Sequence, residues 1–412
     1  MSSVPAWLNS SSFSPRARSP PETPPETPPP PRPPLVEALV ERADPLMQAG
    51  SSGQQEEATS HDVSRSESSR AEQLQAELEK PRIDLNALRQ LATQGIPDSG
   101  GIRAVVWKLL LGYLPRIRSQ WEEELAKKRE QYAQFSQELI VNPSEKSRAS
   151  EASDGDLPSG GELRRESVEG DHPLASGQAS VWHQFFQDTE LWEQIDRDVK
   201  RTHPDLPFFN GADGGSNENQ GALGRILFIF AKLNPGIKYV QGMNEVLAPL
   251  LYIFRTDPDD KNKEHAEADA FFCFVELLSD FRDHFCQQLD NSEVGIRATI
   301  TRLSNLLKQR DEELWLHLNV KIQINPQFYA FRWITLLLTQ EFDFPDCLRL
   351  WDTLLSNKDG PLEILLRLCC AMVICIRTRL LGGDFTDNLK LLQNYPSTDI
   401  DGIIVTADRL RL

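Results

Sequence analysis

Apolar residues recur at helical spacing along most of this chain, and prolines separate the segments. The first stripe covers residues 83–91 and stops ahead of Pro97, and a second covers residues 105–113 and stops at Pro115. Each pattern predicts an amphipathic helix with one buried face. A longer, more charged helix is expected over residues 117–140, where apolar positions are as sparse as on a surface helix.

From residue 181 to about residue 411, one helical pattern follows another. Alternating strand patterns are scarce, hairpin signals are absent, and no repeat of solenoid length appears. The patterning therefore predicts an all-α fold, with a single large multi-helix domain over residues 73–412.

Two segments of low complexity flank or interrupt this pattern. Residues 1–72 are rich in proline and serine and hold too little apolar surface to form a core, so we expect a disordered tail. Within it, the run Pro20–Pro34 favours an extended polyproline helix. That run suits docking to a proline-binding module, although a flexible spacer is the simpler interpretation. Residues 142–178 are expected to form a disordered insertion inside the helical domain.

The charge balance narrows the class of partner. The 412 residues include 44 basic and 61 acidic side chains, for a net charge of −17, and no strongly basic stretch offsets it. Nucleic acid is therefore not expected as a partner. No apolar N-terminal core of secretory length is visible, and the most apolar run, from Leu362, is too short to span a bilayer. We expect a cytoplasmic protein that meets membranes only peripherally, through a partner.

The cysteines lie in apolar helical surroundings without any C-x-x-C pair, which favours reduced, buried thiols over disulfides or a zinc site. They are Cys273, Cys286, Cys347, Cys369, Cys370 and Cys375. His265 and Asp269 lie one helical turn apart, but two side chains do not make a metal site. We interpret both as surface polar residues and expect no metal.

Signatures of a P-loop, a nucleophile elbow or a zinc protease are missing. The stretch LWEQIDRDVKRTHP is more informative, because Leu191, Ile195 and Val199 form one buried stripe. Asp198 and Arg201 lie three residues apart and share a face. The carboxylate can hold the stem of Arg201 and leave part of the guanidinium free. Taken alone, an ordinary exposed ion pair is the simpler interpretation.

The stretch YVQGMN places an uncharged polar side chain, Gln241, at the start of an apolar helix. Gly242 lets the backbone bend or approach another segment closely, while Tyr239 and Met243 are expected to pack beneath. A glutamine amide accepts and donates hydrogen bonds at once, as holding a water molecule for attack requires. Taken alone, a helix cap or a buried amide is the simpler interpretation.

Together, the two stretches suggest a protein that supplies groups to another protein's active site. Phosphoryl transfer to water requires a positioned water and positive charge on the transition state. Arg201 provides the charge and Gln241 the amide, and the chain has no nucleotide motif of its own.

Four segments resemble the signature elements of the TBC domain, in the family's order over about residues 99–395. The segments are RAVVW (Arg103 to Trp107), IDRDVKRTHP, YVQGMN, and FRWITLLLTQEFDFPDCLRLWD (Phe331 to Asp352). The resemblance implies a wholly helical GTPase-activating protein for Rab-type small GTPases. By the same resemblance, Arg201 is the arginine finger, Gln241 is the glutamine finger, and Asp198 orients Arg201.

Further roles follow from the resemblance. Tyr239, Gly242, Met243 and Asn244 would shape the loop that presents the glutamine. A structural place, or one at the edge of an interface, is expected for the remaining motif residues, Arg103, Trp107, Ile195, Trp351 and Asp352. No cofactor is expected, because magnesium and GTP arrive with the partner GTPase. The alternative is a helical scaffold or adaptor that binds a GTP-loaded Rab without speeding hydrolysis.

Overall fold

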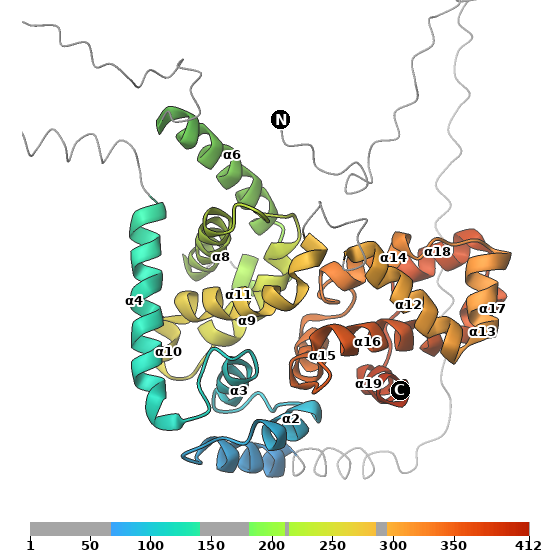
Figure 1. Cartoon of the computed structure of the whole chain (residues 1–412), viewed down its shortest axis with the longest axis horizontal. Coiled ribbons are helices and arrows are strands. Elements are labelled where there is room, and N and C mark those ends of the chain that lie inside the picture. Colours follow the sequence, from blue (N-terminus) through green and yellow to red (C-terminus); the bar gives the residue numbers. More distant parts are fainter. Residues whose placement is uncertain (1–66, 141–180, 211–213, 286–294, 412) are drawn as a thin grey trace, which may run out of the picture. The chain divides into compact units, whose positions relative to one another are not determined.

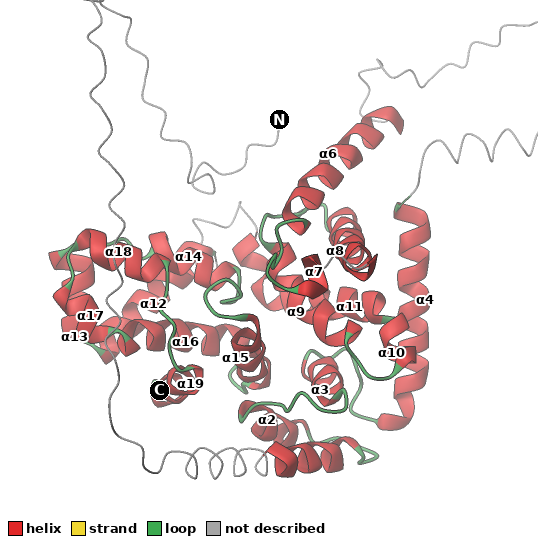
Figure 2. Cartoon of the chain, turned by 180° about the vertical axis from the view of Figure 1, so that it is seen from behind, coloured by secondary structure: helices red, strands yellow, loops and turns green. Residues whose placement is uncertain are grey.

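The structure is a computed structural model that describes residues 67–140, 181–210, 214–285 and 295–411 (Figure 1). The run Pro20–Pro34 and the insertion at residues 142–178 lie outside these residues. Throughout the described part the chain forms helices, turns and loops, without strands, which confirms the predicted all-α class (Figure 2). The first described helix spans residues 67–78 and so begins before residue 73, where order was expected.

The predicted N-terminal helices are present close to their expected bounds. They are α2 (Leu85–Thr93), α3 (Ile102–Leu110), the 3₁₀ turn η1 (Arg118–Gln120) and α4 (Trp121–Leu139). Asp84 caps α2, because its side chain accepts a hydrogen bond from the Asn86 amide at 2.9 Å. In α4 only Tyr132 is fully buried, as the sparse apolar pattern of a surface helix predicted.

The middle of the chain wraps around one buried helix. Its elements are α6 (Val181–Val199), α7 (Pro207–Asn210), α8 (Gly214–Leu233), α9 (Met243–Arg255), α10 (Asp260–Glu264) and α11 (Ala266–Phe285). α9 packs against α3, α6, α8, α10 and α11. Of its 13 residues, 11 are buried, so neighbours cover it on every side.

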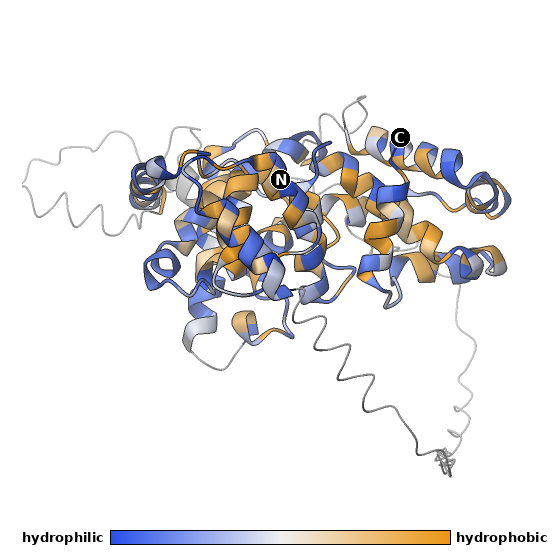
Figure 3. Ribbon diagram, turned by 90° about the horizontal axis from the view of Figure 1, so that it is seen from below, coloured by the Kyte–Doolittle hydropathy of each residue, from blue (hydrophilic) through white to orange (hydrophobic). Residues whose placement is uncertain are grey.

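The C-terminal part packs around α16. Its elements are α12 (Ile296–Arg310), α13 (Glu312–Leu316), the π-helical turn η3 (His317–Lys321), α14 (Gln327–Thr335), α15 (Phe344–Ser356), α16 (Pro361–Cys375), α17 (Arg377–Gly382), α18 (Phe385–Gln393) and α19 (Ile400–Arg409). α16 contacts α11, α12, α14, α15 and α19. Hydrophobic and polar residues occupy different faces of individual helices (Figure 3).

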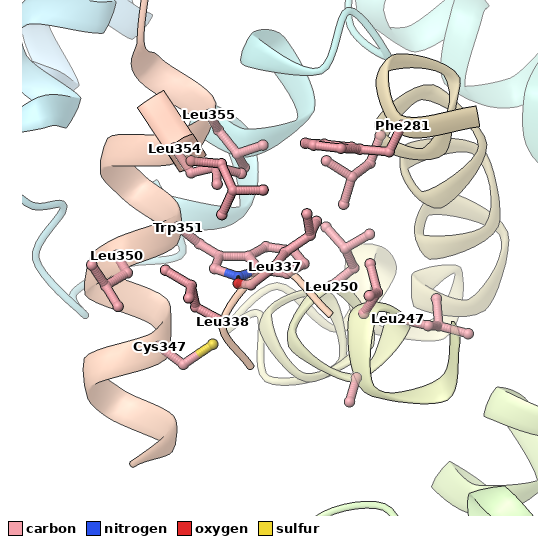
Figure 4. Close-up of a cluster of buried hydrophobic side chains, with 14 of the residues drawn as sticks. Leu247, Leu250, Phe281, Leu337, Leu338, Cys347, Leu350, Trp351, Leu354 and Leu355 are labelled. Carbon is pink, nitrogen blue, oxygen red and sulfur yellow. Dashed lines mark hydrogen bonds between the residues drawn. The ribbon is translucent and has the colours of Figure 1, made fainter. Parts of the chain in front are cut away.

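Trp351 of α15 fills the space between this part and the buried α9. Its ring belongs to the same buried cluster as Leu247 and Leu250 of α9 and Phe281 of α11 (Figure 4). The indole Nε1 donates to the carbonyl of Leu337 at 3.2 Å, and the side chain is fully buried. A fully buried tryptophan whose N–H is satisfied contributes strongly to packing.

Two expectations about side chains were wrong. Asp269 is fully buried, although His265 is exposed as expected. The Asp269 carboxylate accepts from Lys108 (2.6 Å), Tyr113 (2.6 Å) and Arg129 (2.8 Å) and so joins α3, α4 and α11. Burial alone would raise the pKa of Asp269, but these hydrogen bonds and the two cations outweigh it and hold the pKa below its usual range.

The second correction concerns the cysteines. Within the described residues, Cys273, Cys347, Cys369 and Cys370 are free and buried, as predicted. Cys375 is exposed instead, because it stands at the last position of α16, where the helix face turns out of the core.

Candidate functional site

Arg201 stands just beyond the C-terminal end of α6, in a turn where its amide donates to the Asp198 carbonyl at 3.1 Å. Its Nε donates to the Arg197 carbonyl at 3.1 Å, and its Nη2 donates to the Asp198 carboxylate. These two contacts hold the stem, while 67% of the side chain remains exposed. The guanidinium is therefore held from one side and open on the other, as the spacing of Asp198 and Arg201 predicted.

Asp198 is buried and has a second partner. Its other carboxylate oxygen accepts from the hydroxyl of Tyr239 at 2.7 Å. Burial, together with the charge of Asp198, raises the pKa of Tyr239, so the hydroxyl keeps its proton and remains a donor. The carboxylate thus links the turn that carries Arg201 to the segment that carries Gln241.

Gln241 lies in a loop between α8 and α9. The loop starts with a tight turn, in which the Asn234 carbonyl accepts from the amides of Ile237 (3.0 Å) and Lys238 (2.8 Å). The side chain of Gln241 is exposed and makes no hydrogen bond to any residue that the structure describes. The exposure excludes a buried amide and leaves the amide group open to solvent or to a partner.

Gly242 fixes the loop against a neighbouring turn. Its φ is 100°, a conformation that residues with a side chain rarely adopt, and a Cβ at this position would lie 2.5 Å from Cδ2 of Leu336. Directly after it, α9 begins at the fully buried Met243, whose sulfur accepts from the Val240 amide at 3.4 Å. The glutamine is therefore presented from a loop whose end is packed on both sides.

Asn244 joins the two halves of the site. Its side-chain oxygen accepts from the Gly242 amide at 3.2 Å, and its Nδ2 donates to the Thr202 hydroxyl at 2.9 Å. Thr202 follows Arg201 directly and is buried. The sequence analysis missed Thr202, although its place next to the arginine in the R-T element was a usable signal.

Two titratable groups next to the site were also missed, the buried Glu245 and the half-buried His203. Glu245 accepts from Nδ2 of Asn244 at 3.1 Å, and burial raises its pKa to about 7. His203 places Nε2 at 3.5 Å from Glu245 Oε2, and burial lowers the pKa of His203 to about 4. Because the imidazole is then neutral at pH 7, this contact is not a charged pair there.

The turn after α14 supports the glutamine loop from below. Leu337 and Leu338 adopt left-handed φ values of 50° and 65°, in a turn directly next to Leu336. Trp351 holds this turn through its bond to the Leu337 carbonyl. The buried Trp351 of α15 therefore holds this strained turn in place. The turn in turn positions the Leu336 side chain against Gly242.

The other predicted site residues are buried side chains that hold the framework together. Asp352 accepts from Arg103 Nε (3.2 Å), Trp107 Nε1 (2.8 Å) and the Ile96 amide (2.9 Å). Trp107 and Trp351 pack ring to ring, with centroids 5.7 Å apart. These side chains tie α3 to α15 and stabilise the framework. Ile195, which is fully buried on α6, likewise anchors the helix that ends at Arg201.

Within the described residues, no group of three or more histidine, cysteine or acidic side chains is placed to hold a metal ion. A helix long and apolar enough to cross a membrane is likewise missing from that part of the chain. The site presents two exposed polar groups, the guanidinium of Arg201 and the side-chain amide of Gln241.

Comparison with known proteins identifies the class. The model of the Rab-GTPase-TBC domain family matches residues 176–381, and this chain belongs to that family of Rab GTPase-activating proteins. The chain is 40% identical to TBC1 domain family member 13 of Homo sapiens over 404 residues, which cover 83% of this chain and 98% of that protein.

More distant relatives agree. GTPase-activating protein gyp1 of Schizosaccharomyces pombe is 30% identical, over 78% of this chain and 56% of that protein. Among solved structures, the Ypt/Rab-GAP domain of Gyp1p gives a TM-score of 0.65 at 26% identity and covers 84% of this chain and 97% of that domain. A flagellar RabGAP TBC domain from Chlamydomonas shares the fold, with a TM-score of 0.55.

Proposed function

We propose that this protein accelerates GTP hydrolysis by a Rab-type GTPase and that it does so by inserting Arg201 and Gln241 into the partner's active site. The observation that carries the proposal is the link between the two residues. Asp198 binds both Arg201 and Tyr239, and Asn244 binds both Gly242 and Thr202. Two exposed functional groups are thus held by one buried network.

The roles follow from chemistry. The Arg201 guanidinium stabilises negative charge on the transferred phosphoryl group, and the Gln241 amide orients the attacking water. An arginine supplied in trans accelerates hydrolysis by about 10³- to 10⁵-fold, which corresponds to about 4–7 kcal/mol of barrier. Magnesium and GTP belong to the GTPase, so this protein needs no nucleotide site.

The buried network makes this rate gain possible. An exposed arginine loses side-chain freedom when it enters a partner's site, and that loss opposes binding. Asp198 and the Arg197 carbonyl already restrict the stem of Arg201 before the partner arrives. In this proposal the protein is cytoplasmic and associates with membranes only by binding its partner GTPase.

The test is hydrolysis under single-turnover conditions with a panel of GTP-loaded Rab GTPases. On the best substrate, Arg201→Ala and Gln241→Ala should each reduce kcat/KM by about 10²-fold or more. Arg409→Ala and Gln134→Ala remove the same residue types from exposed positions on α19 and α4 and should leave the rate unchanged. Binding without acceleration across the panel would favour the scaffold alternative. Full activity in both finger variants would refute the assignment.

A further inference from the structure

Lys238 stands three residues before Gln241 and holds an unusual backbone conformation. Its φ is 62°, in the left-handed region that disfavours side chains and suits glycine. The tight turn imposes this geometry, because the Lys238 amide must donate to the Asn234 carbonyl at 2.8 Å. A lysine therefore occupies a position where the fold alone favours glycine. Such outliers cluster at functional sites.

The side chain of Lys238 gives a reason for that choice. It is exposed, and its ammonium makes no ion pair or hydrogen bond with any described residue. Two nearby lysines differ, since Lys200 pairs with Asp196 and Lys232 pairs with Asp188, each at 2.7 Å. The ammonium of Lys238 is thus left free on a chain whose net charge is −17.

The position of Lys238 brings this cation beside the site. The next residue, Tyr239, donates to the same carboxylate that receives Arg201. The backbone of Lys238 is therefore fixed one residue away from the link between the two fingers. A partner that takes up both Arg201 and Gln241 therefore lies next to the backbone of Lys238, from which the exposed side chain extends.

We propose that Lys238 contacts the GTPase, with its ammonium paired to a carboxylate on the partner's surface at the rim of the nucleotide site. This inference rests on the proposed function and adds a residue that selects the partner. A charge at the rim of an interface acts on association and on the choice of partner more than on the chemical step. Because the rest of this chain is acidic, a single free cation here also reduces repulsion of an acidic partner surface.

The choice of a carboxylate, and not of a nucleotide phosphate, has a kinetic consequence. A contact with the GTPase surface is the same in the ground state and in the transition state, so its loss raises KM and leaves kcat unchanged. Loss of a contact with the transferred phosphoryl group would lower kcat instead. The division between KM and kcat therefore identifies the target of the ammonium.

Two neutral substitutions separate charge from backbone. Glycine and asparagine both adopt a left-handed φ readily, so Lys238→Gly and Lys238→Asn remove the charge without straining the backbone. For the same reason, Lys238→Gly should raise the melting temperature or leave it unchanged. On the best Rab substrate, each should raise KM by about 3- to 10-fold with kcat within about twofold. Lys238→Glu should raise KM further, and Lys238→Arg should keep it near the native value.

Lys261→Glu, at an exposed position of α10, serves as the control and should leave KM unchanged. Added salt should raise KM of the native protein more than that of Lys238→Gly, because only the native protein loses a screened ion pair. Three results overturn the inference: an unchanged KM in Lys238→Glu, a fall in kcat at constant KM, or a lower melting temperature in Lys238→Gly.

The same assay keeps the two proposals apart. If the native protein accelerates hydrolysis and Arg201→Ala abolishes the acceleration while Lys238→Glu keeps its KM, only the inference about Lys238 fails. If the native protein accelerates no GTPase in the panel, the proposed function fails and the inference fails with it.

Discussion

The contact between Gly242 and Leu336 gives a sharp test of how the glutamine loop is held. A methyl group at position 242 would meet two obstacles, a φ of 100° and the Leu336 side chain at 2.5 Å. The backbone conformation costs about 1–2 kcal/mol for a residue with a Cβ, and overpacking costs about 1–3 kcal/mol. Gly242→Ala should therefore destabilise the protein by about 2–5 kcal/mol.

A double-mutant cycle separates the two terms. Leu336→Ala alone removes a half-buried side chain, with a modest loss of stability. Combined with Gly242→Ala, it removes the steric contact but not the unfavourable φ. The cycle should therefore show a favourable coupling of about 1–3 kcal/mol, measured as free energies of unfolding in urea.

The function should follow the geometry. Gly242→Ala moves the loop that carries Gln241, and a misplacement of about 1 Å can reduce the rate by about 10²-fold. We expect the double variant to recover part of the hydrolysis rate that the single variant loses. Gly236→Ala is the matched control, since it lies in the same loop and its Cβ would meet nothing within 4 Å. Strictly additive free energies in the cycle would refute this account of the loop.

Three further predictions concern the buried framework. Burial raises the pKa of Glu245 to about 7, so Glu245 ionises at a lower pH in the unfolded chain than in the folded protein, and the free energy of unfolding falls as the pH rises. Between pH 5 and pH 8, the free energy of unfolding of Glu245→Gln should therefore rise by up to about 3 kcal/mol relative to that of the native protein. A difference between the two proteins that stays constant with pH in urea unfolding would contradict this. Asp352→Asn leaves the buried Arg103 with only the exposed carboxylate of Asp98 as its counter-ion, and the loss of the buried charged contact should lower the free energy of unfolding by about 1.5–3 kcal/mol in urea. Iodoacetamide should label Cys375 in the native protein but label Cys369 only after unfolding, as peptide mass spectrometry can check.

Local sequence patterns were sufficient for the helices and for the pairing next to the arginine. The stripes at residues 83–91 and 105–113 predicted α2 and α3 because helix periodicity is a property of neighbouring residues. The spacing of Asp198 and Arg201 predicted their contact for the same reason. The failed prediction for Asp269 had the opposite cause, since all three of its partners come from segments far away in the sequence.

The sequence by itself thus determined the helical class, the buried stripes and the two side chains, Arg201 and Gln241, on which the proposed function rests. Only the tertiary structure decided how they work together. The bond between Asn244 and Thr202 spans 42 residues along the chain, and no periodic pattern records a contact of that range. The same holds for Leu336 against Gly242, because such contacts arise when separately folded helices pack and fill a common core.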